Sequence, residues 1–138
     1  MTYEDRPVSV TNPSHYRSHP SGVECIDIVR HLPFNVGNAI KYLWRAGDKG
    51  GPEKLREDLE KALWYIQDAI DNPRASTYSE LVDYELLAKW NRVESKTQRG
   101  RIIILTIFGF VDLAKQELEA WLDNIPKPSD GIDQESIR

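Results

Sequence analysis

The sequence has little cysteine and no long apolar segment. Cys25 is the one cysteine among 138 residues, so the chain can form neither an internal disulfide nor a zinc site built from several thiolates. Its longest apolar run, residues 102–111, covers about half of the roughly 20 residues that a membrane-spanning helix needs. The first residues have neither an apolar core nor a positively charged leader, so no signal peptide is expected. We therefore expect a soluble, cytoplasmic protein.

The chain also lacks an excess of positive charge. Its 18 Lys and Arg residues are outnumbered by 22 Asp and Glu residues, for a formal net charge of −4. A protein that coats nucleic acid needs a basic surface, so this class is excluded. The cations nevertheless exceed the acids within residues 15–50, which also hold all three histidines. That basic region suits a small anionic ligand.

What the sequence does contain is the pattern of one α-helical domain. A length of 138 residues, with 40% hydrophobic and 29% charged residues, fits a single globular domain. Apolar residues recur at helical spacing, most regularly from Leu55 to Ile70. The β-branched run 102–104 has no second strand candidate of similar strength to pair with, so we interpret it as part of a buried helix. The expected helices cover residues 22–32, 35–46, 52–71, 77–93 and 97–122.

We expect an all-α fold of about five helices around a central helical hairpin. Residues 1–20 are predicted to form an extended N-terminal arm and residues 125–138 a flexible tail, because both are polar and contain prolines. Residues 21–74 form the predicted core, and residues 75–124 a C-terminal helical pair that packs on it. Because residues 102–105 are apolar on every side, we expect a second subunit to cover them. The predicted protein is therefore a homo-oligomer with this pair at its interface.

A polar stripe on the predicted helix 35–46 is the first candidate site. Its polar residues recur at i, i+3, i+4 and i+7, opposite the apolar face: Asn38, Lys41, Tyr42 and Arg45. Two cations, an amide and a phenol on one face can hold a phosphate and contact a base. The alternative is an ordinary solvated helix face, which is also typically rich in Lys and Arg.

The next helix carries a second polar stripe, made of Asp58, Lys61 and Tyr65. At the i, i+3 spacing, Asp58 and Lys61 can form a modest ion pair within the helix, which is the ordinary interpretation. If the two helices pack as an antiparallel hairpin, this stripe and the first one line the same pocket. Lys49, in the glycine-rich loop between the helices, is then expected to close over the pocket.

Two further groups of residues lie nearer the N-terminus. The acidic residues Glu24 and Asp27 share one face of the first helix with His31, a set that can bind a divalent ion. We interpret it instead as a polar face paired with Arg30, and so predict no metal site. His15 lies in the proline-rich arm, where a histidine can act as acid or base or can be an ordinary surface residue.

Several common catalytic motifs do not occur in the sequence. The chain has no Walker phosphate loop, no dinucleotide-binding fingerprint, no zinc-protease helix and no nucleophile elbow. Cys25 has acidic neighbours, which raise the pKa of a thiol, so a catalytic thiolate is not expected.

Four segments of the chain form a combined pattern: NPSHY (12–16), GVECID (22–27), GNAIKYLWRAGDKGG (37–51) and EDLEKALWYIQ (57–67). Together they resemble a small phage-encoded family, described both as a domain of unknown function and as nucleotide kinase-like. The resemblance covers residues 12–70. It implies a phage origin and an activity on nucleotides, since some members are described as deoxynucleoside monophosphate kinases. The residues that it carries over are His15, Tyr16, Glu24, Asn38, Lys41, Tyr42, Arg45, Lys49, Asp58, Lys61 and Tyr65.

A fainter similarity leads to the all-α nucleotide pyrophosphohydrolases of the MazG type. Their metal-binding helix carries the pattern E-x-x-D before an apolar stretch, and residues 58–65 stand at the equivalent place. Lys61 occupies the position of the second carboxylate, where it would repel Mg²⁺. This similarity therefore favours a site that neutralises phosphates with Lys and Arg instead of a metal.

The resemblance and the two stripes lead to one hypothesis, a nucleotide-binding phage protein in the cytoplasm of an infected bacterial host. It is predicted to be a metal-independent (deoxy)nucleoside monophosphate kinase-like phosphotransferase, with a nucleoside triphosphate as donor and no other cofactor. The expected substrate-binding residues are Tyr16, Asn38, Lys41, Tyr42, Arg45, Lys49, Lys61 and Tyr65. The expected catalytic residues are Asp58, Glu24 and His15.

Three alternatives stay open at this point. The same pocket can act as a non-catalytic sponge that sequesters a (cyclic) nucleotide immune signal, which is an anti-defence function. A MazG-like nucleotide pyrophosphohydrolase is the second alternative, and a helical adaptor that binds a host protein through residues 76–124 is the third. The expected partners are a nucleotide and a second copy of the chain, with neither a membrane nor a nucleic-acid polymer.

Overall fold

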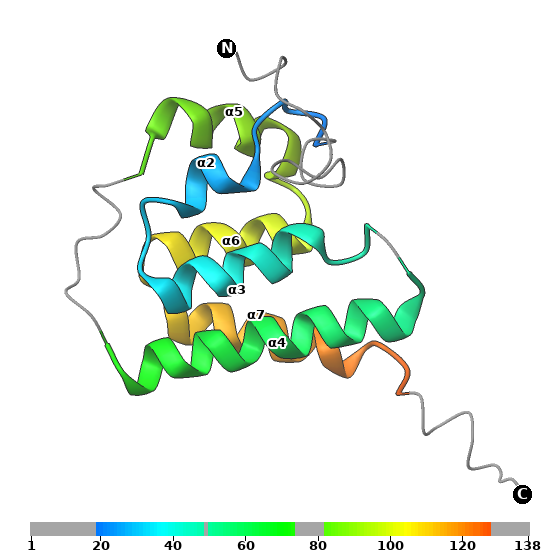
Figure 1. Cartoon of the computed structure of the whole chain (residues 1–138). Helices are drawn as coiled ribbons and strands as arrows, with labels where there is room; N and C mark the ends of the chain where they lie inside the picture. The colour runs from blue at the N-terminus through cyan, green and yellow to red at the C-terminus, as the bar shows by residue number, and fades with distance from the viewer. Residues whose placement is uncertain (1–18, 49, 74–81, 128–138) are drawn as a thin grey trace, which may run out of the picture.

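The computed structural model describes residues 19–48, 50–73 and 82–127. All regular secondary structure in these ranges is helical, so the predicted all-α class is confirmed there. The helices are α2 (Cys25–Val29), α3 (Phe34–Arg45), α4 (Pro52–Asp71), α5 (Tyr84–Glu94), α6 (Gln98–Ile107) and α7 (Val111–Asp123) (Figure 1). Within the same ranges, no helix has the length and the apolar character that crossing a membrane requires.

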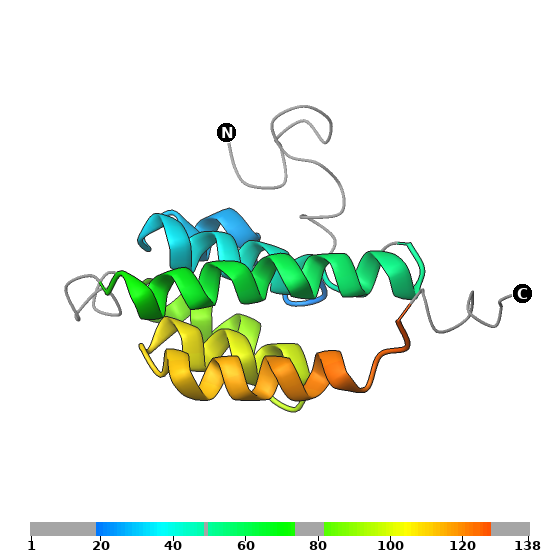
Figure 2. The ribbon, with the colours of Figure 1, turned by 90° about the horizontal axis from the view of Figure 1, so that it is seen from below.

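Four of the helices pack in a closed ring. α3 packs on α4, α4 on α7, α7 on α6, and α6 back on α3. Neighbours in this ring run in opposite directions (Figure 1), and Figure 2 shows α4 lying between α3 and α7. The two remaining helices, α2 and α5, contact each other and cover the α3–α6 side.

The central helical hairpin predicted from the sequence is present as α3 and α4, the most extensively packed pair of helices. The apolar face of α3 is buried, including Ile40 and Leu43, which are fully inaccessible. On α4 the residues that face α3 and α7 include Leu59 and Ile66, also fully inaccessible. Burial of each such side chain contributes about 1.5–3 kcal/mol. Pro52 opens α4 at its first turn, where its missing N–H costs nothing.

The predicted first residues of two helices, α2 and α5, are wrong. α2 begins at Cys25 instead of residue 22, because Glu24 and Asp27 form a capping box that starts the helix there. α5 begins at Tyr84, since Asp83 caps it by accepting hydrogen bonds from two backbone N–H groups. The capping box predicted at Thr77 lies outside the described residues.

The predicted helix 97–122 is two helices. The chain turns between α6 and α7 at Gly109, whose φ of +87° favours glycine. α6 is helical through the isoleucine run, so the choice of helix over strand there is confirmed.

The chain itself covers much of the apolar turn at residues 102–105. Ile102 and Ile103 are buried inside the ring, while Ile104 and Leu105 are half-buried. A second subunit is therefore not needed to cover the whole turn, which corrects the reasoning from sequence.

The predicted arm and tail fall mostly outside the described residues, since 1–18 and 128–138 are not among them. Two residues at their inner ends belong to the folded body. His19 is 9% exposed and Ile125 is 7% exposed. Arg56 of α4 donates hydrogen bonds to the carbonyl groups of Leu122 and Ile125, which joins α4 to the end of α7.

Candidate functional site

The two polar stripes predicted on successive helices meet on one face of the α3–α4 hairpin. The ring of Tyr42 is at the centre, with Lys41 Nζ 5.1 Å and Lys61 Nζ 5.5 Å from its centroid. Tyr65 of α4 stacks on the same ring at 6.1 Å, with an angle of 13° between the planes. We call this surface the α3–α4 face; it consists of Lys41, Tyr42, Arg45, Lys54, Glu57, Asp58, Lys61 and Tyr65.

Asp58 lies at the base of the α3–α4 face and is 1% exposed. Its Oδ1 atom is 3.7 Å from Arg45 Nε and 3.5 Å from Lys54 Nζ, yet it accepts no hydrogen bond. A buried carboxylate is costly unless cations compensate its charge, and here two of them do. Asp58 therefore holds Arg45 and Lys54 in place, and its buried Oδ1 is an acceptor still short of a donor.

Glu57 joins the lysines of α4 at the surface. One of its carboxylate oxygens lies 3.4 Å from Lys54 Nζ and the other 3.1 Å from Lys61 Nζ. The hydrogen bond from Lys61 and the charge of Lys54 lower the pKa of Glu57, and the same hydrogen bond raises the pKa of Lys61. The intrahelical pair expected between Asp58 and Lys61 is thus replaced, since Lys61 pairs with Glu57.

Lys54 and Glu57 are site residues that the reasoning from sequence missed. Both follow from the helical period, because Lys54, Glu57, Asp58 and Lys61 stand at i, i+3, i+4 and i+7 on the same side of α4. The four cations and two carboxylates of the α3–α4 face leave it with a net positive charge, in a chain whose total is −4. This positive charge makes the face suitable for an anionic ligand.

Exposed aromatic rings border the α3–α4 face. Phe34 is 72% exposed and Trp64 is 63% exposed. Both meet the ring of Tyr65 edge-on, at centroid distances of 6.1 Å and 5.1 Å. Large exposed rings of this kind are typical of binding surfaces, and they can stack on a planar ligand.

The other predicted site residues have different outcomes. Asn38 is half-buried and donates a hydrogen bond to the Phe34 carbonyl of its own helix. Glu24 is 2% exposed at the N-cap of α2, so its evident role is to start that helix. The remaining three lie outside the described residues: His15, Tyr16 and Lys49.

Cys25 agrees with the expectation that the chain has no catalytic thiolate. Burial raises the pKa of Cys25 to about 12, against a smaller lowering by the charge of Lys41. The acidic neighbour Asp27 adds a lesser increase, so burial is the main cause, which the sequence argument did not recognise.

Of the polar face interpreted on the first helix, the structure shows the ion pair between Asp27 and Arg30, at 3.4 Å. Glu24 is instead buried at the N-cap, and His31 lies beyond the end of α2 at Val29. Among the described residues, no group of three or more His, Cys, Asp or Glu side chains is placed to hold a metal ion.

A second polar cluster joins His19 to Glu94, two residues that lie 75 positions apart in the sequence. His19 accepts at Nδ1 from the Ser21 backbone N–H at 3.1 Å, and its Nε2 lies 2.7 Å from Glu94 Oε2. The Ser21 hydroxyl oxygen is 2.6 Å from Nδ1. A serine, a histidine and a glutamate in successive contact are typical of a hydrolase triad. Here, however, the histidine ring and the carboxylate are buried between helices. We interpret the cluster as a structural anchor.

Arg99 completes this anchor. It donates to Glu94 at 3.0 Å and 3.2 Å, and to the Trp44 carbonyl at the end of α3 at 2.7 Å. Burial alone would raise the pKa of Glu94, but hydrogen bonds from His19 and Arg99, among others, outweigh it and hold that pKa well below the ordinary value of 4.5. The anchor therefore joins the segment before α2, the end of α3 and the α5–α6 turn.

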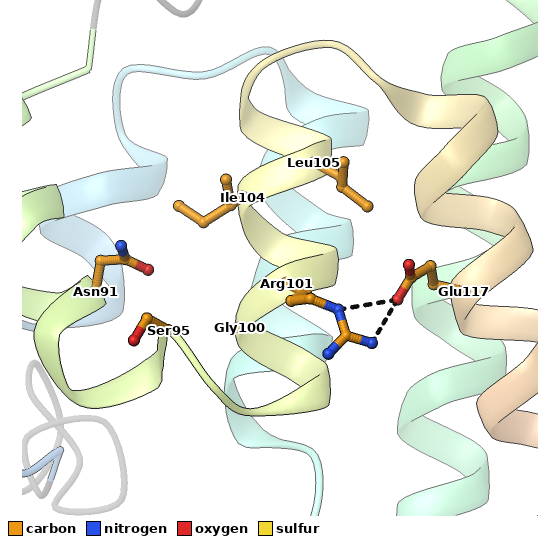
Figure 3. Close-up of a pocket in the computed structure, with 7 residues that line it drawn as sticks. All are labelled: Asn91, Ser95, Gly100, Arg101, Ile104, Leu105 and Glu117. Carbon is orange, nitrogen blue, oxygen red and sulfur yellow. Dashed lines mark hydrogen bonds and ion pairs between the residues drawn. The ribbon is translucent and has the colours of Figure 1, made fainter.

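A groove of about 350 Å³ lies on another side of the molecule, between α5, α6 and α7 (Figure 3). Its wall is formed by Ile104 and Leu105, which project from α6. At one end Arg101 and Glu117 form an ion pair of 2.9 Å across the α6–α7 gap. None of the residues predicted for the site lines this groove.

Comparison with known proteins adds one match. The model of a protein family of unknown function, DUF3310, matches residues 10–67. That range contains α2, α3 and most of α4, and with them every site residue expected from the sequence. No curated protein and no solved structure matches the chain.

Proposed function

We propose that the chain binds a nucleotide on the α3–α4 face. The observation that carries this proposal is the close combination of stacked tyrosine rings and cationic side chains on one surface. Lys41 and Lys61 lie above the Tyr42 ring, and Arg45 with Lys54 surrounds the buried Asp58. Cations of this kind hold phosphate oxygens through charge-assisted hydrogen bonds, and the aromatic rings offer a stacking surface for a base.

The expected kinase-like phosphotransferase is the catalytic form of this proposal. It requires the phosphates of donor and acceptor to be aligned while their charge is neutralised. A specific observation favours the second form, binding without turnover: both carboxylates of the α3–α4 face are already paired with its cations. A sponge for a nucleotide signal is therefore the second candidate function. Phage origin, host cytoplasm and an anti-defence role remain part of the proposal.

Calorimetric titration of the four deoxynucleoside monophosphates, ATP and a cyclic dinucleotide tests the binding site. Lys41→Ala and Arg45→Ala should each weaken binding by about 1–3 kcal/mol, because each removes a charge-assisted contact to phosphate. Lys89→Ala is the matched control, since Lys89 is an exposed lysine on α5. Unchanged affinity in both site variants, with their helical circular dichroism intact, would place the site elsewhere.

Product analysis separates the forms of the proposal. Incubating a deoxynucleoside monophosphate with a nucleoside triphosphate should yield diphosphates if the protein transfers a phosphoryl group. Tight binding without any product leaves the sponge. Release of pyrophosphate from a triphosphate supports the MazG-like alternative, and the absence of any nucleotide binding supports the helical adaptor.

We also propose that the chain self-associates through the face around the α5–α6–α7 groove. Arg101, Ile104 and Leu105 stand at i, i+3 and i+4 along one side of α6, and Phe108 follows at its C-cap. Phe108 is 39% exposed, and Leu113 on the neighbouring α7 is 49% exposed.

A second copy is the occupant that we propose for this groove, because the face combines apolar side chains with charges of both signs. Its apolar wall carries one cation and one anion, Arg101 and Glu117, so that two copies related by a twofold axis can exchange ion-pair partners. Light scattering coupled to gel filtration at micromolar concentration should show a mass above 15.9 kDa. A monomeric mass would contradict self-association. A monomer is also the result expected if the groove binds a different protein, because that partner is absent from the purified sample.

A further inference from the structure

Glu57 is an anionic side chain held between two lysines of the α3–α4 face. Its two carboxylate oxygens lie 3.4 Å from Lys54 Nζ and 3.1 Å from Lys61 Nζ, so that one anionic group connects two ammonium groups. A phosphate presents neighbouring oxygens to lysines in a similar way. In the free protein, the Glu57 carboxylate thus makes the lysine contacts that a bound phosphate would make.

Glu57 differs from Asp58 in how firmly it is held. The Glu57 side chain is 51% exposed and can turn into water, whereas the Asp58 side chain is 1% exposed and is fixed among helices. Exposed ion pairs between flexible side chains are weak. An incoming anion can therefore displace Glu57, while Asp58 stays and keeps Arg45 and Lys54 oriented.

We propose that the ligand's terminal phosphate displaces Glu57 and takes its place between Lys54 and Lys61. This inference rests on the proposed function and deepens it by naming the ligand class. Lys54 becomes a phosphate-binding residue, and Glu57 a competitor within the site.

Because a ligand must displace a carboxylate of charge −1, this position favours ligand groups that carry more than one negative charge. A phosphate monoester carries about −1.5 to −2 at pH 7, whereas a phosphodiester, like the Glu57 carboxylate, carries a single negative charge. The monoester gains more from Lys54 and Lys61 than Glu57 does, and a diester gains no more. The ligand class is accordingly a nucleotide with a terminal phosphate monoester, in preference to a cyclic one.

Calorimetry with Glu57→Gln and Lys54→Ala tests this inference. One probe is pyrophosphate, which has phosphate groups but no nucleobase. The others are nucleoside 5′-monophosphates and their 3′,5′-cyclic forms, which differ in having a phosphate monoester or a phosphodiester. Glu57→Gln should bind pyrophosphate and the 5′-monophosphate about three- to tenfold more tightly, because two weak competing pairs are removed. Lys54→Ala should bind both more weakly.

Glu60→Gln is the matched control. Glu60 is exposed on the same helix and pairs at i, i+4 with Arg56, at 3.3 Å, away from the lysines of the face. Its substitution removes the same charge and should leave both affinities unchanged. The wild-type chain should bind the 5′-monophosphate at least about tenfold more tightly than the cyclic form, since only the monoester exceeds the charge of Glu57.

The outcomes separate this inference from the proposed function. If nucleotides bind but Glu57→Gln leaves their affinity unchanged or lower, displacement is wrong and nucleotide binding stands. Equal affinity for 5′ and cyclic forms overturns the monoester preference. If pyrophosphate binds Glu57→Gln more tightly but no nucleotide binds, the phosphate position stands and the proposed function fails. If neither probe binds the wild type or Glu57→Gln, both are overturned.

Discussion

At the scale of single residues, burial decides what each acidic side chain does. Asp58, Glu94 and Glu57 each pair with cations, but the first two are buried and the third is exposed. A buried carboxylate that loses its partner leaves an uncompensated charge, so such pairs hold the structure in one arrangement. The exposed carboxylate is free to exchange its partners, which is why we assign the structural role to Glu94 and the competing role to Glu57.

The lowered pKa of Glu94 predicts a pH dependence of stability. A group whose pKa is lower in the folded chain stabilises the fold while it is ionised. That contribution is complete above the ordinary value of 4.5 and is lost progressively as the pH falls below it. Glu94→Gln should remove this part of the pH dependence and lower the free energy of unfolding at pH 7 by about 1–3 kcal/mol.

Urea denaturation at pH 7 and at several values below 4.5 measures both effects of the Glu94 substitution. Glu85→Gln is the control, because Glu85 is exposed on the same helix. Parallel stability profiles for the wild type and Glu94→Gln would show that the anchor has no such role.

At the scale of helices, the close approach of α6 to the end of α5 depends on one glycine. A Cβ atom at Gly100 would lie 2.1 Å from the Glu94 carbonyl oxygen and 2.8 Å from the Thr97 hydroxyl. Thr97 caps α6 by accepting a hydrogen bond from the Gly100 N–H at 2.9 Å. The α5–α6 turn that carries the His19–Glu94 anchor thus has no room for any other residue at this position.

Two alanine substitutions test this account at the helix scale. Gly100→Ala should destabilise the fold by about 1–3 kcal/mol, because the carbonyl it meets is backbone and cannot move away alone. Gly37→Ala, inside α3, should instead stabilise it by about 0.4–1 kcal/mol, since its Cβ would meet Val29 only at ordinary contact distances of 3.6 Å and 3.7 Å. Thermal unfolding of the two variants provides the measurement, and equal shifts would contradict the explanation.

At the scale of the whole molecule, the ring of α3, α4, α7 and α6 encloses one core. α2 closes that core from the α3 side and carries Cys25, which is 3% exposed. Because burial raises the pKa of this thiol to about 12, almost none of it is ionised at pH 8 in the folded chain. The single cysteine therefore reports on opening of the fold.

Labelling of Cys25 with a thiol-specific disulfide reagent should be slow in the folded protein and rapid in urea. We expect the rate at pH 8 to rise with urea in step with unfolding followed by circular dichroism, as opening becomes more frequent. Fast labelling without denaturant would mean that α2 separates from the core by itself.

Self-association should depend on the apolar surface beside the α5–α6–α7 groove. Leu113→Asp places a charge on that surface, so it should shift the protein toward monomer in light scattering. Ile26→Asp is the control, because Ile26 is similarly exposed, at 46%, on α2 outside the groove. An unchanged mass in Leu113→Asp, or an equal loss in both variants, would remove this face from the interface.

Much of the helical pattern could be predicted because it depends on local periodicity. α3 and α4 lie within a residue of their expected bounds, since each has a continuous apolar stripe and a strong end signal in Gly47 or Pro52. The sequence did not predict the break at Gly109, because a single glycine in an apolar run can also lie inside a helix. Its positive φ, which marks the turn, is visible only in the structure. The positions of Lys41, Tyr42, Lys61 and Tyr65 on one face followed from the same periodicity.

The sequence by itself determined the all-α class, the α3–α4 hairpin and the side of each helix that carries its polar residues, because neighbours along a helix share a period of 3.6. Only the tertiary structure decided which charges are buried and which partners they meet. Asp58 is enclosed while Glu57 is not, and His19 meets Glu94 across 75 positions of the chain. Such pairings arise from the packing of separate helices, and no local pattern of residues encodes them.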